Sequence, residues 1–348
     1  MFKFDFSSSA EGSDQAVASE REQKAESDTI IAKIVERARM NAQSCKLVNA
    51  SSTTSGKLQS CVHEHVGLHS KSMDGLHYVL PPQHTTLSEK NTDLIPGVYE
   101  GGLKVWECSI DLCRFLAHIM DETGPAESDL QHVREAVMRS IGESGSVLEL
   151  GCGHGLPACL LLRESIRRLT NSVVVFSDFN DFVLHDVTIP NALLNVCSLQ
   201  RQQSNKSVVD DALLVLQKQS IFAGGDWMGL SHKLSNNEVV LSNSLSEKRV
   251  VEERFDIILA SETTYTTESC NDTAYLMMKH LKADIGVGLV ATKRFYFGVG
   301  GGADAFVQAA DKVSKSSLSV RTIQSYDTGN ANIRDLLEVR LVGKSKQR

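Results

Sequence analysis

Three glycines at alternate positions carry the clearest chemical signal in this sequence. Gly151, Gly153 and Gly155 lie in VLELGCGHGLPACLLL (147–162), after a strand-like apolar run and before a run with helical spacing. Glycines let a backbone turn sharply and approach a ligand, and the helix that follows offers free N–H groups. A dinucleotide loop would place its third glycine at position 156, which is Leu156. The spacing therefore favours a nucleotide-like ligand other than a dinucleotide, although a structural turn would also use such glycines.

Acidic residues follow the next two apolar runs. Asp178 ends the strand-like part of VVVFSDFND (173–181), where a carboxylate can accept hydrogen bonds from both hydroxyls of a ribose. In GGDW, Asp226 is placed to bind the amino group of an adenine, and Trp227 to stack on its ring. An isolated aspartate is more often a helix cap or a turn residue, and an isolated tryptophan is more often core. Their positions after successive strands favour the binding role.

EGGLKVWECS (100–109) stands about forty residues ahead of the glycine loop. Its Trp106 and Glu107, taken alone, are explained by core packing and a surface acid. Their role depends on what the glycine loop binds.

Short apolar runs rich in β-branched residues, separated by helical or irregular segments, predict the scaffold for these residues. Strands that alternate with helices indicate a parallel sheet with helices on both faces. Two further runs alternate apolar and polar residues, as an antiparallel pair at the sheet edge would. The five apolar runs are 146–152, 172–178, 220–226, 255–261 and 287–293, and the alternating pair is 317–323 and 337–343.

The composition changes near residue 90, which predicts an N-terminal extension (1–92) and one packed domain (93–348). Residues 7–28 have almost no large apolar side chains, which predicts disorder. TIIAKIVERARMNAQ (29–43) has the spacing of an amphipathic helix, and a Ser/Thr/Gly-rich linker follows.

Composition narrows the class of protein. The chain has 348 residues, of which 41% are hydrophobic and 23% charged, and no run of eighteen apolar residues, so no membrane association is expected. The sequence turns polar after its first six residues, MFKFDF, which is too soon for the apolar stretch of a secretory signal. This favours a location inside the cell. A net charge of −7 disfavours a broad nucleic-acid surface and favours a protein or small-molecule substrate.

Cysteines and histidines give no convincing metal site. The eight cysteines are scattered without a C-x-x-C pair, which favours reduced, partly buried thiols. Five histidines, at positions 63, 65, 69, 77 and 84, include an H-x-H pair, but no fixed scaffold is evident around them. No metal is therefore expected.

The glycine loop and the two strand-end acids together resemble the class I methyltransferases that use S-adenosylmethionine, and further motifs narrow the resemblance. From about residue 93 onward the chain is similar to the protein-histidine N-methyltransferase family, whose best-known eukaryotic members methylate a histidine of a large-subunit ribosomal protein. The combination of WEC with a distant FGVGGG is the most specific feature. The motifs are DLIPGVYEGGLKVWECSIDL (93–112), FSDFNDFVLHDVTIPNALLN (176–195), GGDW, ILASETTY (258–265) and ATKRFYFGVGGGADAF (291–306).

The resemblance implies a Rossmann-like class I methyltransferase fold with S-adenosyl-L-methionine as cofactor. Glu107 and Glu149 are candidates for favouring its sulfonium cation. Glu262 and Tyr265, after the fourth strand, and Gly300 and Gly301, in FYFGVGGG, are the substrate-side candidates, and no catalytic base is assigned. The implied cofactor residues are Val105, Trp106, Glu107, Cys108, Ser109, Gly151, Gly153, Asp178, Phe179, Asn180, Gly225, Asp226, Trp227 and Ser261.

Two alternatives remain open at this stage. Related protein-lysine methyltransferases also carry a tryptophan and an acid ahead of the glycine loop, and FGVGGG is the feature that separates them. A methyltransferase-like module without catalysis is the other alternative, since fold alone does not prove function. The expected partner is a large-subunit ribosomal protein, and the expected location is cytoplasm and nucleus, possibly nucleolus. A segment at 232–251 has no counterpart in the family pattern.

Overall fold

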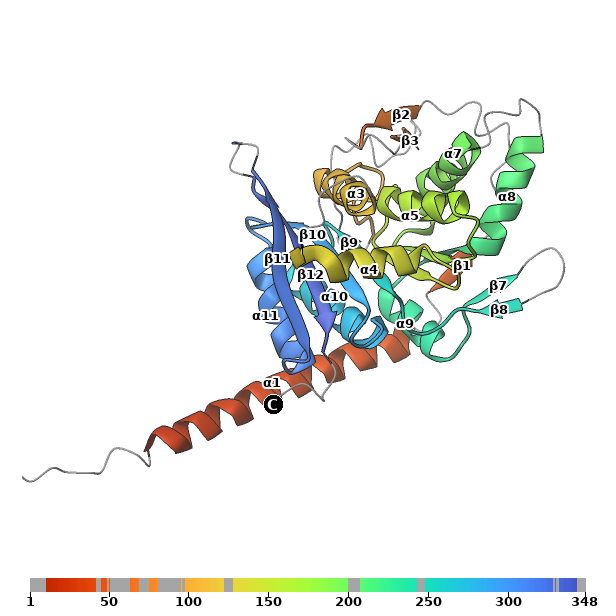
Figure 1. Cartoon of the computed structure of the whole chain (residues 1–348). Helices are drawn as coiled ribbons and strands as arrows, with labels where there is room; N and C mark the ends of the chain where they lie inside the picture. The colour runs from red at the N-terminus through yellow and green to blue at the C-terminus, as the bar shows by residue number, and fades with distance from the viewer. Residues whose placement is uncertain are drawn as a thin grey trace, which may run out of the picture.

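The computed structural model describes most of the chain (Figure 1). The described residues are 11–41, 45–48, 50, 63–68, 75–80, 95, 98–121, 128–199, 207–242, 248–327, 329 and 332–342.

An eight-stranded sheet with the order β1-β6-β5-β4-β9-β10-β12-β11 organises the protein. All five apolar runs predicted as strands form its parallel centre, since their Val, Ile and Leu side chains are buried on both faces. The predicted antiparallel pair is also present, with β12 between β10 and the edge strand β11. The central strands are β4 (Ser146–Leu150), β5 (Val173–Asp178), β6 (Ser220–Gly224), β9 (Ile257–Ser261) and β10 (Val287–Lys293), followed by β11 (Leu318–Tyr326) and β12 (Arg334–Leu341).

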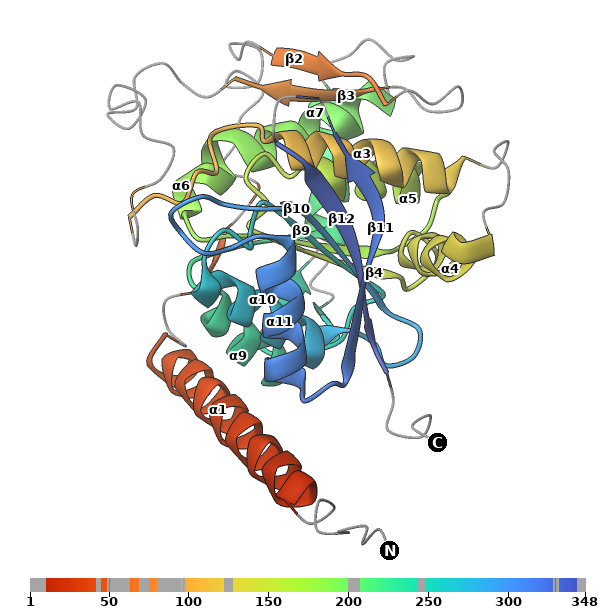
Figure 2. The same cartoon turned by 90° about the vertical axis from the view of Figure 1, so that its left-hand side faces the viewer.

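Helices cover both faces of the sheet, and each face has its own apolar core, so the predicted three-layer architecture is confirmed (Figures 1 and 2). One layer comprises α3 (Glu107–Met120), α4 (Gln131–Ser140), α5 (Leu156–Arg167), α7 (Ile189–Leu199) and α8 (Ser207–Gln219). The other comprises α1 (Glu11–Asn41), α9 (Trp227–Ser235), α10 (Thr267–His280) and α11 (Ala303–Ser314). Short helical turns η3 (Ser128–Leu130), α6 (Asp181–Val183) and η4 (Leu184–Thr188) precede α4 and α7.

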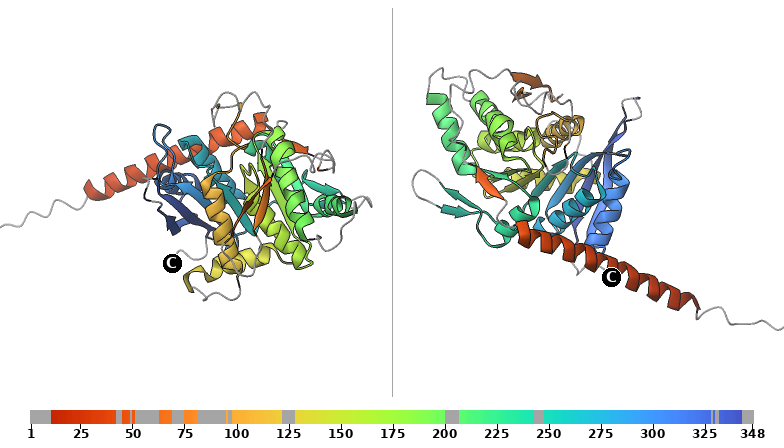
Figure 3. Two further views of the ribbon diagram at one scale, coloured as in Figure 1. Left: turned by 90° about the horizontal axis from the view of Figure 1, so that it is seen from above. Right: turned by 180° about the vertical axis from the view of Figure 1, so that it is seen from behind.

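The prediction of disorder over residues 7–28 is wrong from residue 11 onward, because α1 is one helix from Glu11 to Asn41. Its first half is rich in the helix formers Glu, Ala, Gln and Lys, which have good intrinsic propensity without being apolar. Its second half packs Ile34 into the core, while Lys312 of α11 pairs with Glu26 at 2.8 Å. Figure 3 shows α1 running along the α9 and α11 side of the molecule. Residues 7–10 lie outside the described part.

The predicted boundary at residue 93 does not coincide with the edge of the fold. β1 (Lys46–Val48) extends the central sheet by pairing antiparallel with β6. β2 (His63–Val66) and β3 (Leu76–Val79) form a hairpin that lies beside α7 (Figure 2). Backbone pairing uses N–H and C=O groups that almost every residue has, so segments of low hydrophobicity can join a sheet or cover it.

The segment without a family counterpart, residues 232–251, contains the end of α9 and a small hairpin. β7 (Val240–Ser242) pairs antiparallel with β8 (Lys248–Val250), beside the main sheet and not within it.

Among the described residues, one helical stretch is long and apolar enough to cross a membrane by length and composition alone. It is Asp181–Leu199, and 61% of it is buried inside the protein, as is common for a core helix.

Asn191 of α7 connects the hairpin to the glycine loop. Its side-chain oxygen accepts from the Val79 N–H at 2.7 Å, and its amide donates to the His154 carbonyl at 2.9 Å. Because Asn191 is fully buried, Asn191→Ala leaves both backbone groups without their partner. We expect it to lower the free energy of unfolding by about 2 kcal/mol. Urea denaturation measures the free energy of unfolding. The control is Asn171→Ala, at an exposed asparagine, which should change this free energy by less than ~0.5 kcal/mol. Equal effects of the two substitutions would contradict the role given to Asn191.

Candidate functional site

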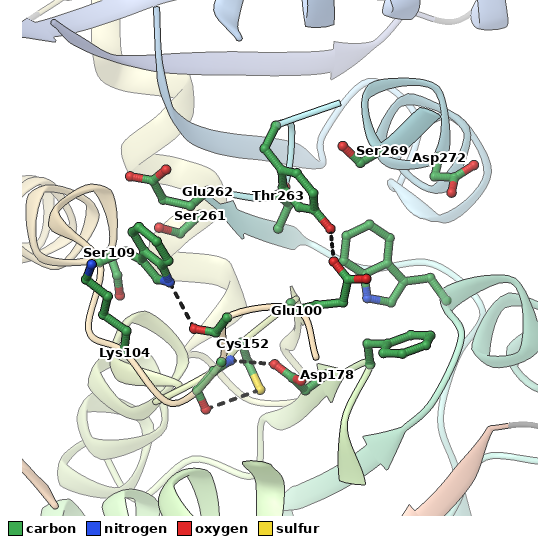
Figure 4. Close-up of a pocket in the computed structure, with 18 of the residues that line it drawn as sticks. Glu100, Lys104, Ser109, Cys152, Asp178, Ser261, Glu262, Thr263, Ser269 and Asp272 are labelled. Atoms are coloured by element: carbon green, nitrogen blue, oxygen red, sulfur yellow. Dashed lines mark hydrogen bonds between the residues drawn. The ribbon is translucent and has the colours of Figure 1, made fainter. Parts of the chain in front are cut away.

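A pocket opens where β4 separates β5 from β9, beyond the carboxyl ends of the parallel strands. In open α/β sheets this is where ligands bind. Figure 4 shows Ser261 and Glu262 on one side of the pocket and Ser269 and Asp272, from α10, on the other.

The glycine loop forms the floor of the pocket, in the conformation that its composition predicts. Gly151, Gly153 and Gly155 have φ values of 58°, 50° and 66°, in the left-handed region that favours glycine. A Cβ on Gly153 would lie 3.0 Å from the Gly102 carbonyl oxygen, and one on Gly151 would lie 3.2 Å from the Trp227 ring. These glycines are therefore required for close approach as well as for the turn.

Asp178 holds the loop in place from the end of β5. Its two carboxylate oxygens accept from the N–H groups of Gly153 at 2.9 Å and of Asn180 at 3.0 Å. Burial raises the pKa of Asp178 to about 6, with a contribution from Glu100, while the two N–H groups act in the opposite direction. A carboxylate oxygen has capacity for more than one hydrogen bond, so Asp178 can still accept from a ligand at the pocket surface.

The 100–109 segment forms a wall of the pocket from outside the sheet. Trp106 donates its indole N–H to the Gly101 carbonyl at 3.0 Å, which closes the turn ahead of α3. The ammonium groups of Lys104 and Lys293 lie 4.5 Å and 5.1 Å from the Trp106 ring centroid, within cation–π range. Packing in the core alone does not describe Trp106, since it lines the pocket.

Asp226 and Trp227 follow β6. Asp226 caps α9 by accepting from the Met228 N–H at 2.7 Å, so the structural role considered for such an aspartate is real and coexists with a place in the pocket wall. The indole nitrogen of Trp227 is buried and has no hydrogen-bond partner among the described residues.

Most residues proposed from the sequence meet in this one pocket. They are Val105, Trp106, Ser109, Gly151, Gly153, Asp178, Phe179, Asp226, Trp227, Ser261, Glu262 and Tyr265.

Four residues implied as cofactor contacts lie outside the lining. Glu107 begins α3 with its side chain 63% exposed and pairs with Arg334 at 3.5 Å. Cys108 is fully buried beneath the wall. Asn180 accepts from the Glu100 N–H at 3.1 Å, and Gly225 donates its N–H to the Asp178 carbonyl, so both support lining residues without joining them.

The two glutamates expected to favour a sulfonium cation do not face the pocket. Glu107 points to solvent and Arg334. Glu149 is buried behind the loop, where it accepts from the Ala158 N–H, and burial raises its pKa to about 8. A carboxyl group with that pKa is mostly neutral near pH 7, so it cannot supply the charge.

Other acids supply that charge, and sequence reasoning missed half of them. The lining holds six carboxylic acids against two bases, Arg37 and Lys104, an excess of four negative charges when all are ionised. Glu100 could have been found from its position before Gly101, and Glu268 and Asp272 from the helix start in TTES (266–269). The acids are Glu100, Asp178, Asp226, Glu262, Glu268 and Asp272.

Glu262 is the most constrained of these acids. Its φ of 55° is a left-handed conformation that a non-glycine residue adopts at a cost on the order of 1–3 kcal/mol. One carboxylate oxygen accepts from the Tyr296 hydroxyl and lies 3.5 Å from Lys293 Nζ. The other oxygen is buried, and the Cys108 thiol lies within hydrogen-bonding reach of the carboxylate. The fold therefore fixes this carboxylate in the pocket wall.

Gly300 and Gly301 do not line the main pocket but an adjacent hollow in the 294–308 segment. Gly300 pairs with Thr266 of the pocket wall. A Cβ on Gly301 would lie 2.2 Å from the Tyr265 carbonyl carbon, so a side chain there would displace the wall itself. Within FYFGVGGG, Gly301 is thus the glycine needed for packing against the 264–265 backbone.

Within the described residues, no group of three or more His, Cys, Asp or Glu side chains is arranged to hold a metal ion. His69 and His84 of the histidine-rich segment lie outside that part. The seven described cysteines are free thiols, and six of them are buried.

The strand order, the antiparallel β12 and the pocket over β4 and β5 define a Rossmann-like class I methyltransferase fold. Sequence comparison then gives a narrower relationship. The chain is 33% identical over 249 residues to "Histidine protein methyltransferase 1 homolog" of Dictyostelium discoideum, covering 71% of this chain and 60% of that protein. It is 32% identical over 246 residues to "Histidine protein methyltransferase 1" of Schizosaccharomyces pombe, covering 67% and 63%. These similarities confirm the resemblance to the protein-histidine N-methyltransferase family.

The chain spans about 60% of the length of the curated relatives it matches. No protein-family model matches it. Solved structures with a related arrangement include the O-methyltransferase TomG from Streptomyces achromogenes, at a TM-score of 0.37 and 14% identity over 69% of this chain and 92% of that one. Fibrillarin from Aeropyrum pernix has a TM-score of 0.35 and 14% identity over 59% and 73%.

Trp106 tests the assignment of the 100–109 segment. We expect Trp106→Ala to weaken S-adenosylmethionine binding about tenfold, equivalent to ~1.4 kcal/mol, because the turn at Gly101 loses its hydrogen bond and the pocket loses a wall. The free energy of unfolding of the ligand-free protein should fall by less than this. Calorimetric titration gives the cofactor affinity, and denaturation gives the free energy of unfolding. Unchanged affinity with lower stability would show that Trp106 serves core packing and not cofactor binding.

Asp178 predicts a pH dependence of cofactor binding. Its pKa is raised from its ordinary value to about 6, so the protonated form gains population as the pH falls through 6, and a protonated carboxyl accepts fewer hydrogen bonds. Affinity for S-adenosylmethionine should therefore decrease from pH 7.5 to pH 5.5. Calorimetric titration across this range measures it.

Asp272, another pocket acid, also has a pKa raised to about 6 by burial, which makes Asp272→Asn the matched control. That variant should keep the decrease, whereas Asp178→Asn should bind weakly at every pH. A decrease as large in Asp178→Asn as in the wild-type protein would contradict the assignment.

Proposed function

We propose that this chain is an S-adenosylmethionine-dependent protein-histidine N-methyltransferase whose substrate is a large-subunit ribosomal protein. The observation that carries the proposal is one pocket beyond the parallel strands, whose glycine loop and Asp178 suit a nucleoside ligand and whose wall holds the fixed Glu262 carboxylate. The names of the relatives support the same activity.

The residues present fit the cofactor. The cradle over Gly151 and Gly153 has no room for a Cβ, which suits a backbone that must approach a ligand. Three lining residues have a buried polar atom without a hydrogen-bond partner among the described residues, and these atoms would bind polar groups of the ligand. They are Ser261 Oγ, Thr263 Oγ1 and Trp227 Nε1. Asp178 would hold the ribose, and Asp226 and Trp227 the adenine. The excess of carboxylates favours a ligand with a sulfonium cation.

When bound, S-adenosylmethionine supplies an electrophilic methyl group on that sulfonium. A neutral imidazole has an ordinary pKa of about 6.5 and needs no strong base, because one ring nitrogen already carries a lone pair. That lone pair would form the new N–C bond as the C–S bond breaks, so that the sulfonium becomes a neutral thioether and the positive charge passes to the ring. What the chain must do is align the ring, select its tautomer and exclude water.

Glu262 would select the tautomer of the substrate imidazole and stabilise the positive charge that develops on its ring. In this proposal a carboxylate oxygen of Glu262 accepts the N–H of the nitrogen that is not methylated, so the other nitrogen presents its lone pair. The same carboxylate stabilises the ring as it becomes cationic, and then receives that N–H proton for transfer to solvent. Tyr296 and Lys293 hold the second oxygen, so the carboxylate is aligned before the substrate arrives.

Tyr265 and the FYFGVGGG loop form the substrate side. The Tyr265 hydroxyl donates to Glu100 across the pocket, joining the 100–109 wall to the segment after β9 (Figure 4). Beyond it the loop exposes apolar side chains beside Gly300 and Gly301, and these would contact the polypeptide around the target histidine. Their exposed fractions are 55% for Phe295, 89% for Phe297 and 46% for Val299.

The proposal places the protein in the cytoplasm and nucleus, where ribosomal proteins are made and assembled, with the nucleolus as a further site. The proposal includes no direct contact with nucleic acid or membrane, because the net charge is −7 and the proposed substrate is a polypeptide.

Transfer of a labelled methyl group tests the whole proposal. The protein is incubated with labelled S-adenosylmethionine and a ribosomal extract, and the modified residue is identified by mass spectrometry. Label on a histidine of a large-subunit protein is the expected result. Label on lysine alone would assign the lysine alternative, and absence of both label and calorimetric cofactor binding would leave a non-catalytic module.

Glu262→Gln tests the role of the carboxylate. We expect kcat for methyl transfer to fall at least about tenfold, because the amide keeps the shape but not the charge that stabilises the ring. Affinity for S-adenosylmethionine should change by less than about threefold. Single-turnover transfer and calorimetry separate the two effects. Glu238→Gln, at a surface glutamate 48% exposed beside Lys233, is the control; equal rates in all three proteins would remove Glu262 from the mechanism.

A further inference from the structure

The N-terminal helix α1 reaches the cofactor pocket, although the sequence analysis placed it outside the packed domain. Ile34 of α1 is buried in the core of the α9–α11 layer, and Ile30, Ile31 and Val35 pack against it. The helix end is also held closely, since a Cβ on Gly229 of α9 would lie 2.6 Å from the Asn41 carbonyl oxygen. Figures 1 and 2 show α1 beside α9 and α10. Between the packed isoleucines and this end lies Arg37, which lines the pocket.

Arg37 joins α1 to the start of α10 through two acids. One terminal nitrogen of its guanidinium pairs with Glu268 and the other with Asp272. Glu268 and Asp272 are four residues apart on α10, where like charges repel. The Asp272 side chain is only 13% exposed, so its charge is poorly screened by solvent. Arg37 is the cation that offsets this pair.

The same guanidinium acts on the adenine side of the pocket. Asp226 lies close enough to Arg37 to interact with it electrostatically, and both line the pocket with Trp227. Without Arg37, three carboxylates from α9 and α10 would face one another next to the tryptophan. In addition, Arg37 Nε is buried and has no hydrogen-bond partner among the described residues.

We infer that α1 is a wall of the cofactor pocket and that Arg37 is a positioning residue for it, holding Asp226, Glu268 and Asp272 in the arrangement that accepts the adenine. This inference rests on the proposed cofactor. It gives the N-terminal segment a part in cofactor affinity.

Arginine, and not simply a cation, is required by this geometry. Its planar guanidinium presents several N–H donors and can bind two carboxylates at once. The lysine ammonium is a compact point charge, which fits one carboxylate better than two. Arg37→Lys should therefore restore only part of what Arg37→Ala loses. A purely structural role, in which Arg37 only attaches α1, would lower stability and leave cofactor affinity in the folded protein unchanged.

The test is calorimetric titration of the full chain with S-adenosylmethionine. We expect Arg37→Ala to raise Kd at least about tenfold and Arg37→Lys to raise it about threefold, with the KM for the protein substrate unchanged. Lys312→Ala is the matched control, because it removes the ion pair between α11 and Glu26, eleven residues before Arg37 on the same helix. Its Kd should stay within about twofold of the wild-type value.

Glu268→Gln supplies a second variant should Arg37→Ala fold poorly, since the Glu268 side chain is 74% exposed and its change is mild. It keeps Arg37 and Asp272 paired, so its Kd should rise less than that of Arg37→Lys. Unchanged Kd in both Arg37 variants, with the wild-type protein binding normally, would overturn the inference alone. Absence of binding by the wild-type protein would overturn the proposed function and this inference with it.

Discussion

The pocket depends on the close approach of two backbone segments that are fifty residues apart in sequence. A Cβ on Gly153 would lie 3.0 Å from the Gly102 carbonyl oxygen, so the loop meets the turn at Gly102 too closely for a side chain at position 153; a Cβ on Gly102 would lie 2.8 Å from the Val183 side chain. Asp178 fixes this approach by accepting from the Gly153 N–H. Because the two segments are locked together, the wall containing Trp106 and the floor from β4 form one rigid surface.

Burial separates the acids of this region into two kinds. Glu149 lies behind the loop, where burial keeps it largely neutral and its hydrogen bond to the Ala158 N–H supports the start of α5. Glu262 lies at the pocket, where one of its oxygens accepts from the Tyr296 hydroxyl and lies 3.5 Å from Lys293 Nζ. A ligand that carries positive charge into this pocket therefore meets carboxylates that the fold has already oriented, and the protein need not reorganise during the reaction.

The central strands were predictable because they are buried on both faces and contain β-branched residues in short runs, a pattern that few other structures produce. The N-terminal segment was not. Disorder was predicted for residues that form the first half of α1, because composition reports apolar content and not the ion pairs and propensity that extend a docked helix. β1 escaped notice for a similar reason, since three residues at an edge need only backbone pairing.

The sequence by itself determined the sheet, the glycine loop and the acids at strand ends, because each is specified by residues close together along the chain. Tertiary structure decided which acids face the ligand. Both Glu107 and Glu262 were candidates from the sequence, but the first residue of α3 points to solvent, while Glu262, in a left-handed turn after β9, lines the pocket. Arg37 belongs to the site only because α1 docks beside α10. Such placements depend on packing between distant segments, which local sequence patterns do not encode.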